Sequence, residues 1–122
     1  MPAKVTLGIL ALLLIASASP AEEEPSVWMK HKLKYSQEIL SGLAQEDYAV
    51  IKKNALGMKS LNSIEFFVRQ RPEGYRTQLK SFQFSVEKLL RHAEDRNLDG
   101  ATLAFTQMTI SCVNCHKELR ED

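Results

Sequence analysis

Apolar residues recur at steps of three and four positions along most of this chain of 122 residues, from about residue 26 to residue 120. This spacing places them on one face of an α-helix. No stretch alternates apolar and polar residues with the period of two that a half-buried strand shows. The pattern therefore predicts an all-α protein.

Breaks in the pattern divide the chain into four helical segments. Ser26 is expected to cap the first helix, Asp47 the second and Asp99 the last, and the run RQRPEG separates the second from the third. The apolar stripes are Met29, Leu33, Leu40 and Leu43; Tyr48, Ile51, Ala55, Met58, Leu61 and Val68; Tyr75, Leu79, Phe82, Val86, Leu89 and Ala93; and Ala101, Phe105, Met108, Cys112, Cys115 and Leu119. Four helices joined by short connections favour an antiparallel up-down-up-down four-helix bundle.

The first 21 residues differ from the rest of the chain. Lys4 is the only charged residue before Glu22, and the apolar run VTLGILALLLIASA is followed by small residues. This arrangement is typical of a secretory signal peptide, and the run is shorter than the ~20 apolar residues of a membrane-spanning helix. We expect residues 1–21 to be a signal peptide, cleaved after Ala21 or Ala18, and an uncleaved anchor is the alternative. Residues 22–122 would then form one exported or periplasmic domain, with no stable membrane insertion after signal removal.

The residues with the most distinctive chemistry lie in CVNCH, residues 112–116, which contains both cysteines and one of the three histidines. Cys-x-x-Cys-His is the attachment signal for c-type haem. Two thiols one helical turn apart can bond to the two vinyl groups of a porphyrin, and the next residue can give the iron an imidazole ligand. His116 follows Cys112 by four residues, so it points to the same side of the helix.

Two other chemistries use the same residues. A Cys112–Cys115 disulfide is the ordinary expectation for two cysteines in an exported protein, but a reactive thiol–disulfide pair normally lies at a helix N-terminus. Structural zinc needs four ligands, and Cys112, Cys115 and His116 supply three. The position of both cysteines on the apolar stripe of an exported helical chain favours haem. The disulfide remains an alternative, and the protein would then be a haem-free helical interaction module.

The sequence resembles the class II cytochromes c, the cytochrome c′ group, from about residue 28 to residue 120. The similarity is strongest in SCVNCHKELR, and LSGLAQEDY is similar to the glycine-containing turn of that family. The resemblance implies one haem c bound covalently through Cys112 and Cys115. It also implies His116 as the proximal iron ligand and Arg120 as the basic residue four positions later. Leu119 stands where the family commonly has tyrosine.

The resemblance further implies that the first helix lies on the distal side of the haem. A methionine there makes the iron low-spin, whereas an apolar residue leaves the iron open to nitric oxide or carbon monoxide. Met29 is the soft donor on the apolar stripe of this helix, and paired Met and His ligands are a recognised haem ligation. Counting back from Gly42 places the family's ligand position nearer Ser26, one turn from Met29. We expect His116 and Met29 to hold the iron.

The sequence therefore predicts an exported monohaem cytochrome that carries single electrons between redox partner proteins and is not an enzyme. A pentacoordinate cytochrome that binds nitric oxide or carbon monoxide is the alternative. The first helix often carries a dimer face in the resembling family, so a homodimer remains open.

Charge gives information about partners. Removal of the leader takes away Lys4 alone, so 15 of the 16 basic residues remain against 15 acidic ones. This balance gives no electrostatic footprint for nucleic acid. Lys30, His31, Lys32 and Lys34 nevertheless lie close together. They are a candidate docking patch for an acidic redox partner, and an ordinary solvated helix face is the alternative.

Overall fold

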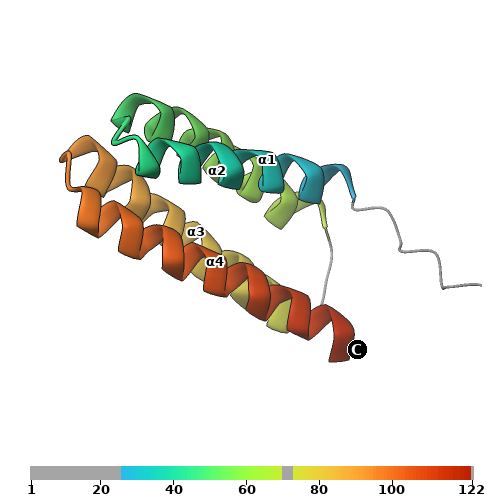
Figure 1. Ribbon diagram of the computed structural model, residues 1–122. Helices are drawn as coiled ribbons and strands as arrows, with labels where there is room; N and C mark the ends of the chain where they lie inside the picture. Colours follow the sequence, from blue (N-terminus) through green and yellow to red (C-terminus); the bar gives the residue numbers. More distant parts are fainter. Residues whose placement is uncertain (1–25, 70–72, 122) are drawn as a thin grey trace, which may run out of the picture.

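The computed structural model describes residues 26–69 and 73–121, and these residues form four helices and no strand (Figure 1). The helices are α1 (Val27–Ala44), α2 (Tyr48–Val68), α3 (Glu73–Glu94) and α4 (Leu98–Glu121). The predicted all-α class is confirmed. The leader expected over residues 1–21 lies outside the described residues. Within the described ranges, no helix is both long enough and apolar enough to cross a membrane.

Short polar side chains satisfy free N–H groups at the start of three helices. Ser26 and Asp47 do so at α1 and α2, where their side-chain oxygens accept from the N–H three residues later at 3.4 and 3.1 Å. These two caps are confirmed. At α4 the cap is Asn97, whose Oδ1 accepts from the N–H of Gly100 at 2.9 Å. The expected cap Asp99 lies instead in the first turn, where its charge favours the helix dipole.

The α1–α2 turn and the α3–α4 turn have the same backbone design and lie at the same end of the molecule (Figure 1). Each contains a residue of positive φ, Glu46 at 55° and Arg96 at 54°. In each, the next N–H bonds to the carbonyl five residues earlier at 2.8 Å. The Tyr48 hydroxyl donates to the Arg96 carbonyl at 3.0 Å, and the Arg96 guanidinium lies 4.7 Å from the Tyr48 ring centroid. These contacts hold the two turns together.

The apolar core lies in the half of the molecule next to these turns. Every residue of the stripe predicted on α3 is buried, as expected. The core cluster comprises Ile39, Leu43, Tyr48, Ile51, Ala55, Met58, Phe82, Val86, Leu89, Leu90, Ala93, Ala101, Ala104 and Met108.

Several residues of the predicted stripes are exposed. On α1, Leu33 and Leu40 are 59% and 56% exposed while Ile39 is completely buried, so the prediction was wrong at these two positions. The reason is that α1 packs mainly on α2, and this turns Ile39 rather than Leu40 into the core. Leu43 of the same stripe is buried in the core, as predicted. Val68 and Leu119 are also exposed, because they lie near helix ends beyond the reach of the core.

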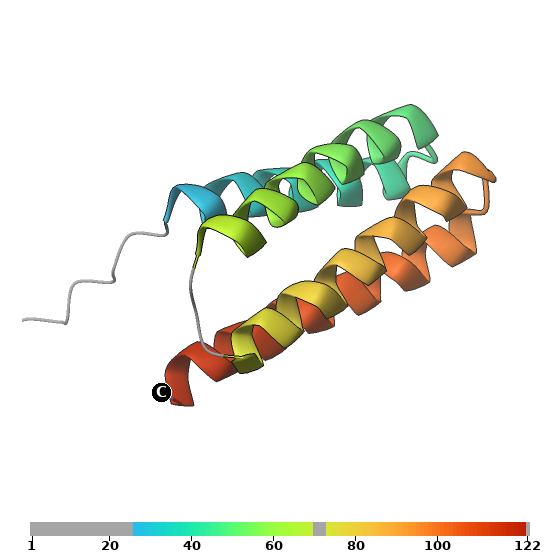
Figure 2. The same cartoon turned by 180° about the vertical axis from the view of Figure 1, so that it is seen from behind.

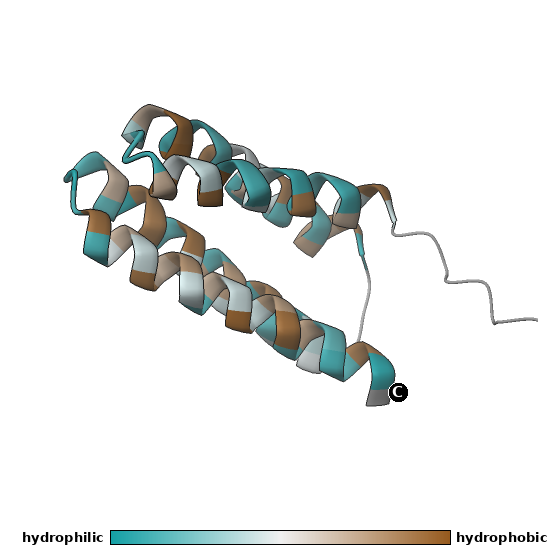
Figure 3. Cartoon of the chain, in the orientation of Figure 1, coloured by the Kyte–Doolittle hydropathy of each residue, from teal (hydrophilic) through white to brown (hydrophobic). Residues whose placement is uncertain are grey.

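The two helix pairs, α1–α2 and α3–α4, diverge away from the turns (Figures 1 and 2). α1 packs along α2, α2 along α3, and α3 along α4, whereas α1 and α4 barely touch. Figure 3 shows hydrophobic residues continuing along α4 into this open half of the molecule. The bundle therefore has a closed half filled by its own side chains and an open half between α1 and α4.

We predict that Ile39→Ala lowers the free energy of unfolding by about 2–5 kcal/mol, because it removes a completely buried side chain and leaves a cavity. The neighbouring change Leu40→Ala is the matched control and should cost about 0.5 kcal/mol or less, since Leu40 is mostly exposed. Urea unfolding measures both. Equal losses in the two variants would contradict this orientation of α1.

Candidate functional site

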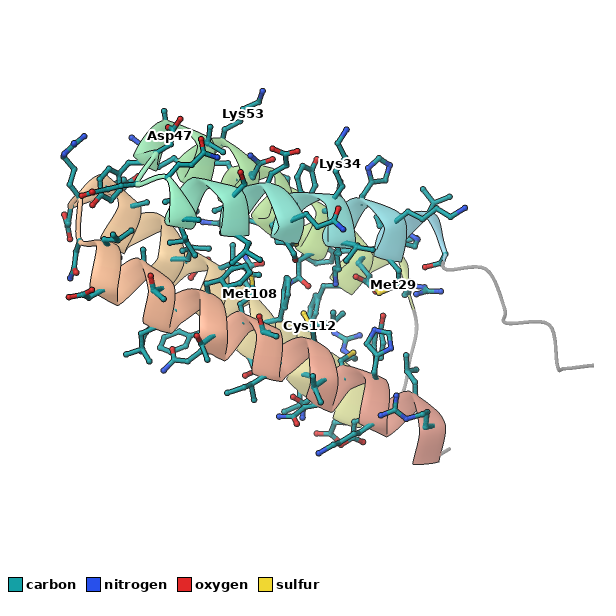
Figure 4. The ribbon with its side chains drawn as sticks, in the orientation of Figure 1. Met29, Lys34, Asp47, Lys53, Met108 and Cys112 are labelled. Atoms are coloured by element: carbon teal, nitrogen blue, oxygen red, sulfur yellow. The ribbon has the colours of Figure 1, made fainter. Side chains whose placement is uncertain are left out.

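A cavity of about 320 Å³ lies in the open half, between α1, α3 and α4. Its volume falls within the range of small-molecule sites, and its lining is mostly apolar. The lining residues are Met29, Lys32, Leu33 and Ser36 of α1, Gln78, Leu79 and Phe82 of α3, and Ser111, Cys112, Cys115 and His116 of α4. Figure 4 shows Met29 and Cys112 on facing sides of the space between α1 and α4. Four of the five expected site residues thus line one cavity.

The Cys-x-x-Cys-His segment lies within the regular helix α4. Cys112 and Cys115 are half-buried free thiols, and His116 is more exposed but belongs to the cavity wall. Burial raises the pKa of both thiols, although the Lys32 ammonium lowers it in part. This setting differs from the lowered thiol pKa that makes a cysteine a reactive redox switch. The two cysteines are therefore placed as side chains of a binding cavity.

Met29 occupies the opposite wall, in the first turn of α1, and is half-buried. Met58 and Met108 lie in the core cluster instead, with 0% and 1% exposure. Ser26 caps α1 and is not part of the cavity lining. Among the described residues, Met29 is therefore the methionine that faces the cavity.

Arg120 is exposed in the last turn of α4. It follows His116 by one turn, but the cavity lining ends at His116. The structure therefore does not bring Arg120 together with the other four expected site residues.

Lys32 is the residue at this site that the sequence pattern misassigned. Its side chain is 11% exposed and its Nζ lies 2.5 Å from Oε2 of Glu65. The same Nζ donates to Oδ1 of Asn62 at 3.4 Å and lies 4.7 Å from the ring centroid of Phe82. A buried ammonium needs such partners, because its desolvation is costly.

The candidate docking patch on α1 therefore needs correction. Lys30, His31 and Lys34 are exposed, but Lys32 points into the bundle and its charge is paired. The four residues do not form one solvated basic face. Because the helical repeat is 3.6 residues, a consecutive charge cluster spreads around the helix and one member meets the interior.

Glu65 of α2 is the centre of a buried polar network. Its carboxylate is fully buried, accepts a hydrogen bond from the Tyr75 hydroxyl, and lies 3.6 Å from an Arg69 guanidinium nitrogen. Lys32 is the only partner of Oε2 among the described residues. Burial alone would raise the pKa of Glu65, but the hydrogen bond and charge of Lys32, with help from Tyr75 and Arg69, hold it below the usual value of 4.5. The ionised carboxylate joins α1, α2 and α3.

Asn62 extends this network toward the outside of the bundle. Its Nδ2 donates to the carbonyl of Leu79 at 3.1 Å and to Oε1 of Gln83 at 3.0 Å. Sequence analysis missed Asn62, Glu65 and the inward role of Lys32. The sequence does contain one signal for a buried charge, because Glu65 is the single charged residue in the apolar run IEFFV.

Within residues 26–69 and 73–121, no group of three or more His, Cys, Asp or Glu side chains is arranged to hold a metal ion. The donors at the cavity are instead two thiols and an imidazole on one wall and a thioether on the other, around an apolar space. Such a set suits haem, a flat and largely apolar group that brings four nitrogen ligands of its own to the iron, so the protein would supply the remaining donors.

The chain matches no protein-family model, no curated protein and no solved structure.

We predict that Glu65→Leu lowers the free energy of unfolding by about 3–5 kcal/mol, because it strands the Lys32 ammonium inside the protein. Adding Lys32→Met should recover part of this loss, since no buried charge then remains unpaired. Glu87→Leu is the control. Glu87 pairs with Lys59 at 3.3 Å with both side chains 42% exposed, so its loss should cost about 1 kcal/mol or less. A double variant no more stable than Glu65→Leu would contradict the pairing.

The lowered pKa of Glu65 also predicts an acid dependence. Its stabilising contribution is fully present above pH 4.5, the usual carboxyl value, and is lost as the pH falls through the lowered folded-state pKa. The unfolding free energy of the unaltered protein should therefore fall more steeply below pH 4.5 than that of the Lys32→Met, Glu65→Leu variant. Urea unfolding across this pH range measures the difference, and parallel pH profiles would contradict it.

Proposed function

We propose that the protein is an exported or periplasmic monohaem c-type cytochrome that carries single electrons. Its fold would be the antiparallel up-down-up-down bundle of the cytochrome c′ type, preceded by the leader over residues 1–21. One observation carries the proposal: Cys112, Cys115 and His116 on α4 share an apolar cavity with Met29 on α1. Two thiols, an imidazole and a thioether are together the donor set of a c-type haem with Met/His ligation.

Four residues of the cavity have distinct parts in this function. Cys112 and Cys115 would hold the group covalently on α4, and His116 and Met29 would be the protein's ligands to its iron. When bound, haem supplies the iron that alternates between the ferric and ferrous states. The apolar walls of the cavity exclude water and lower the local polarity, which together with the axial ligands sets the reduction potential.

The ion pair between Lys32 and Glu65 helps to define which side chain of α1 can ligate the haem iron. An ammonium has no lone pair, so Lys32 in its ion pair with Glu65 is not a metal ligand. Ser36 on the same wall is a poor ligand for haem iron. Met29 is thus the suitable distal donor that α1 presents to the cavity.

The other functions remain as alternatives. If Met29 only packs, the apolar distal wall would leave the iron able to bind nitric oxide or carbon monoxide. If no haem is attached, the chain would be a helical interaction module in which Cys112 and Cys115 form a disulfide.

We predict that protein exported through its own leader carries the mass of one haem after denaturation and reduction. Replacing both Cys112 and Cys115 by alanine should abolish the covalent attachment and lower stability, because the open half then lacks the group that fills it. Mass spectrometry and the Soret band report attachment. Replacing Ser36, which lines the same cavity, with alanine is the control that should keep the haem. A Soret-free protein with the mass of the bare chain would refute the proposal.

We predict that the reduced protein shows the sharp α and β bands of low-spin haem, and that Met29→Ala abolishes them and lets carbon monoxide bind. Leu33→Ala, one turn further along the same cavity wall, is the matched control and should keep the low-spin spectrum. Visible spectra with and without carbon monoxide measure this. If the unaltered reduced protein is already high-spin and binds carbon monoxide, gas binding is the better account.

A further inference from the structure

The outer face of α2 and α3 carries exposed and half-buried aromatic rings and cations that neither the core nor the first cavity uses. We call this surface the α2–α3 patch. It comprises Phe66 and Phe67 of α2 and Arg76, Lys80, Phe84 and Lys88 of α3.

The patch surrounds a second cavity of about 350 Å³ between α2 and α3, which Phe66, Phe67 and Phe84 help to line. Phe67 is 82% exposed and Phe84 is 59% exposed. Large aromatic side chains grouped on a surface mark interaction sites, because their contact with water is unfavourable.

The cations of the patch lie over its rings. The Arg76 guanidinium is 4.4 Å from the Phe66 ring centroid, and the Lys88 ammonium is 4.6 Å from that of Phe84. Lys80 also approaches Phe66, at 5.9 Å. Within the described ranges, these three cations form no ion pair with an acidic side chain.

The charge of the patch is unbalanced, although the chain as a whole carries a formal charge of only +1. Glu87 is the one acidic residue that lines the second cavity, and Lys59 already pairs with it at 3.3 Å. The patch therefore presents a local positive excess around an aromatic centre, which complements a surface bearing carboxylates.

The patch is also close to the first cavity. Leu79 lines both cavities, so a single side chain separates them at that point. Asn62 provides a polar link, because it accepts from Lys32 of the first cavity and itself lines the second. A group bound in the first cavity would lie close behind this surface.

We propose that the α2–α3 patch is the docking surface for an acidic one-electron carrier protein, with the electron crossing the layer formed by Leu79 and Asn62. This inference rests on the proposed function. In the transfer, the partner loses one electron and the haem iron gains it, or the reverse, and no covalent bond forms or breaks.

Charge and position favour this occupant over the others. A second copy of the chain would bring the same positive face to a symmetric interface, and the like charges would repel. An anionic lipid surface would match the charge but would not require the short path to the first cavity. Lys34 is exposed and lies on α1, whereas the patch lies on α2 and α3, so Lys34 provides a control.

The test uses the haem-loaded protein and reduced flavodoxin, a small acidic one-electron carrier, in stopped-flow measurements at low and high salt. Arg76→Glu with Lys80→Glu should slow reduction about tenfold at low salt, with the rates converging at high salt. Lys34→Glu with Lys53→Glu is the control. It makes the same change in net charge at exposed positions outside the patch, and its rate should stay within about twofold of the unaltered protein.

Lys80→Gln alone should give a rate of reduction between those of the unaltered protein and the double variant. This milder change is a control for a folding defect in the double variant, and circular dichroism checks that both variants are folded. Equal slowing by the patch and control variants, or no slowing by the patch variant, would overturn the docking proposal in a protein whose haem spectrum is normal. A patch that binds phosphatidylglycerol vesicles while reduction by flavodoxin is unaffected would overturn it in favour of a lipid surface. A protein without haem would overturn the proposed function as well.

Discussion

The buried carboxylate of Glu65 is the interaction on which the open half of this bundle depends. The closed half is held by ordinary apolar packing and by the contacts between its two turns. Beyond the core, α1 packs along α2 but barely touches α4. Glu65 adds a polar anchor for α1 at the cavity, because it binds Lys32 of α1 and Tyr75 of α3 while standing on α2. A single ionised group thus ties the α1 wall of the site to α2 and α3.

The walls of that site differ in how they are held. Cys112, Cys115 and His116 belong to one continuous helix, so their spacing follows from α-helical geometry alone. Met29 stands in the first turn of α1, and its position depends on the Ser26 cap and on the Lys32 ion pair one turn away. The spacing of the residues on the α4 wall is therefore fixed within one helix. The position of Met29 on the α1 wall depends instead on contacts that α1 makes with other residues. In the proposed function, covalent attachment would therefore use the α4 wall, and ligation by Met29 would depend on the anchors of α1.

Periodicity predicted the fold well where a helix buries one continuous apolar stripe, as α3 does. It failed for the middle of α1, because Leu33 and Leu40 are as apolar as Ile39 and only the direction of the neighbouring helix decides which is buried. The Cys-x-x-Cys-His segment was visible in the sequence because its chemistry depends on local spacing. The Lys32–Glu65 pair was not, since the two residues lie on different helices and each looks like an ordinary surface charge. Pairings across the bundle arise from tertiary packing, which a single sequence does not display.

The division into a closed and an open half bears on how the protein would be assembled. The closed half contains residues from all four helices and needs no added group to complete its core. It can therefore hold the four helices in register before any ligand arrives. The open half, with its apolar cavity between α1 and α4, would then be the binding site. Binding of a ligand there would shift the folding equilibrium toward the folded protein by the free energy of binding. In the proposed function, the bound group would therefore add most to the stability of the helix ends away from the turns.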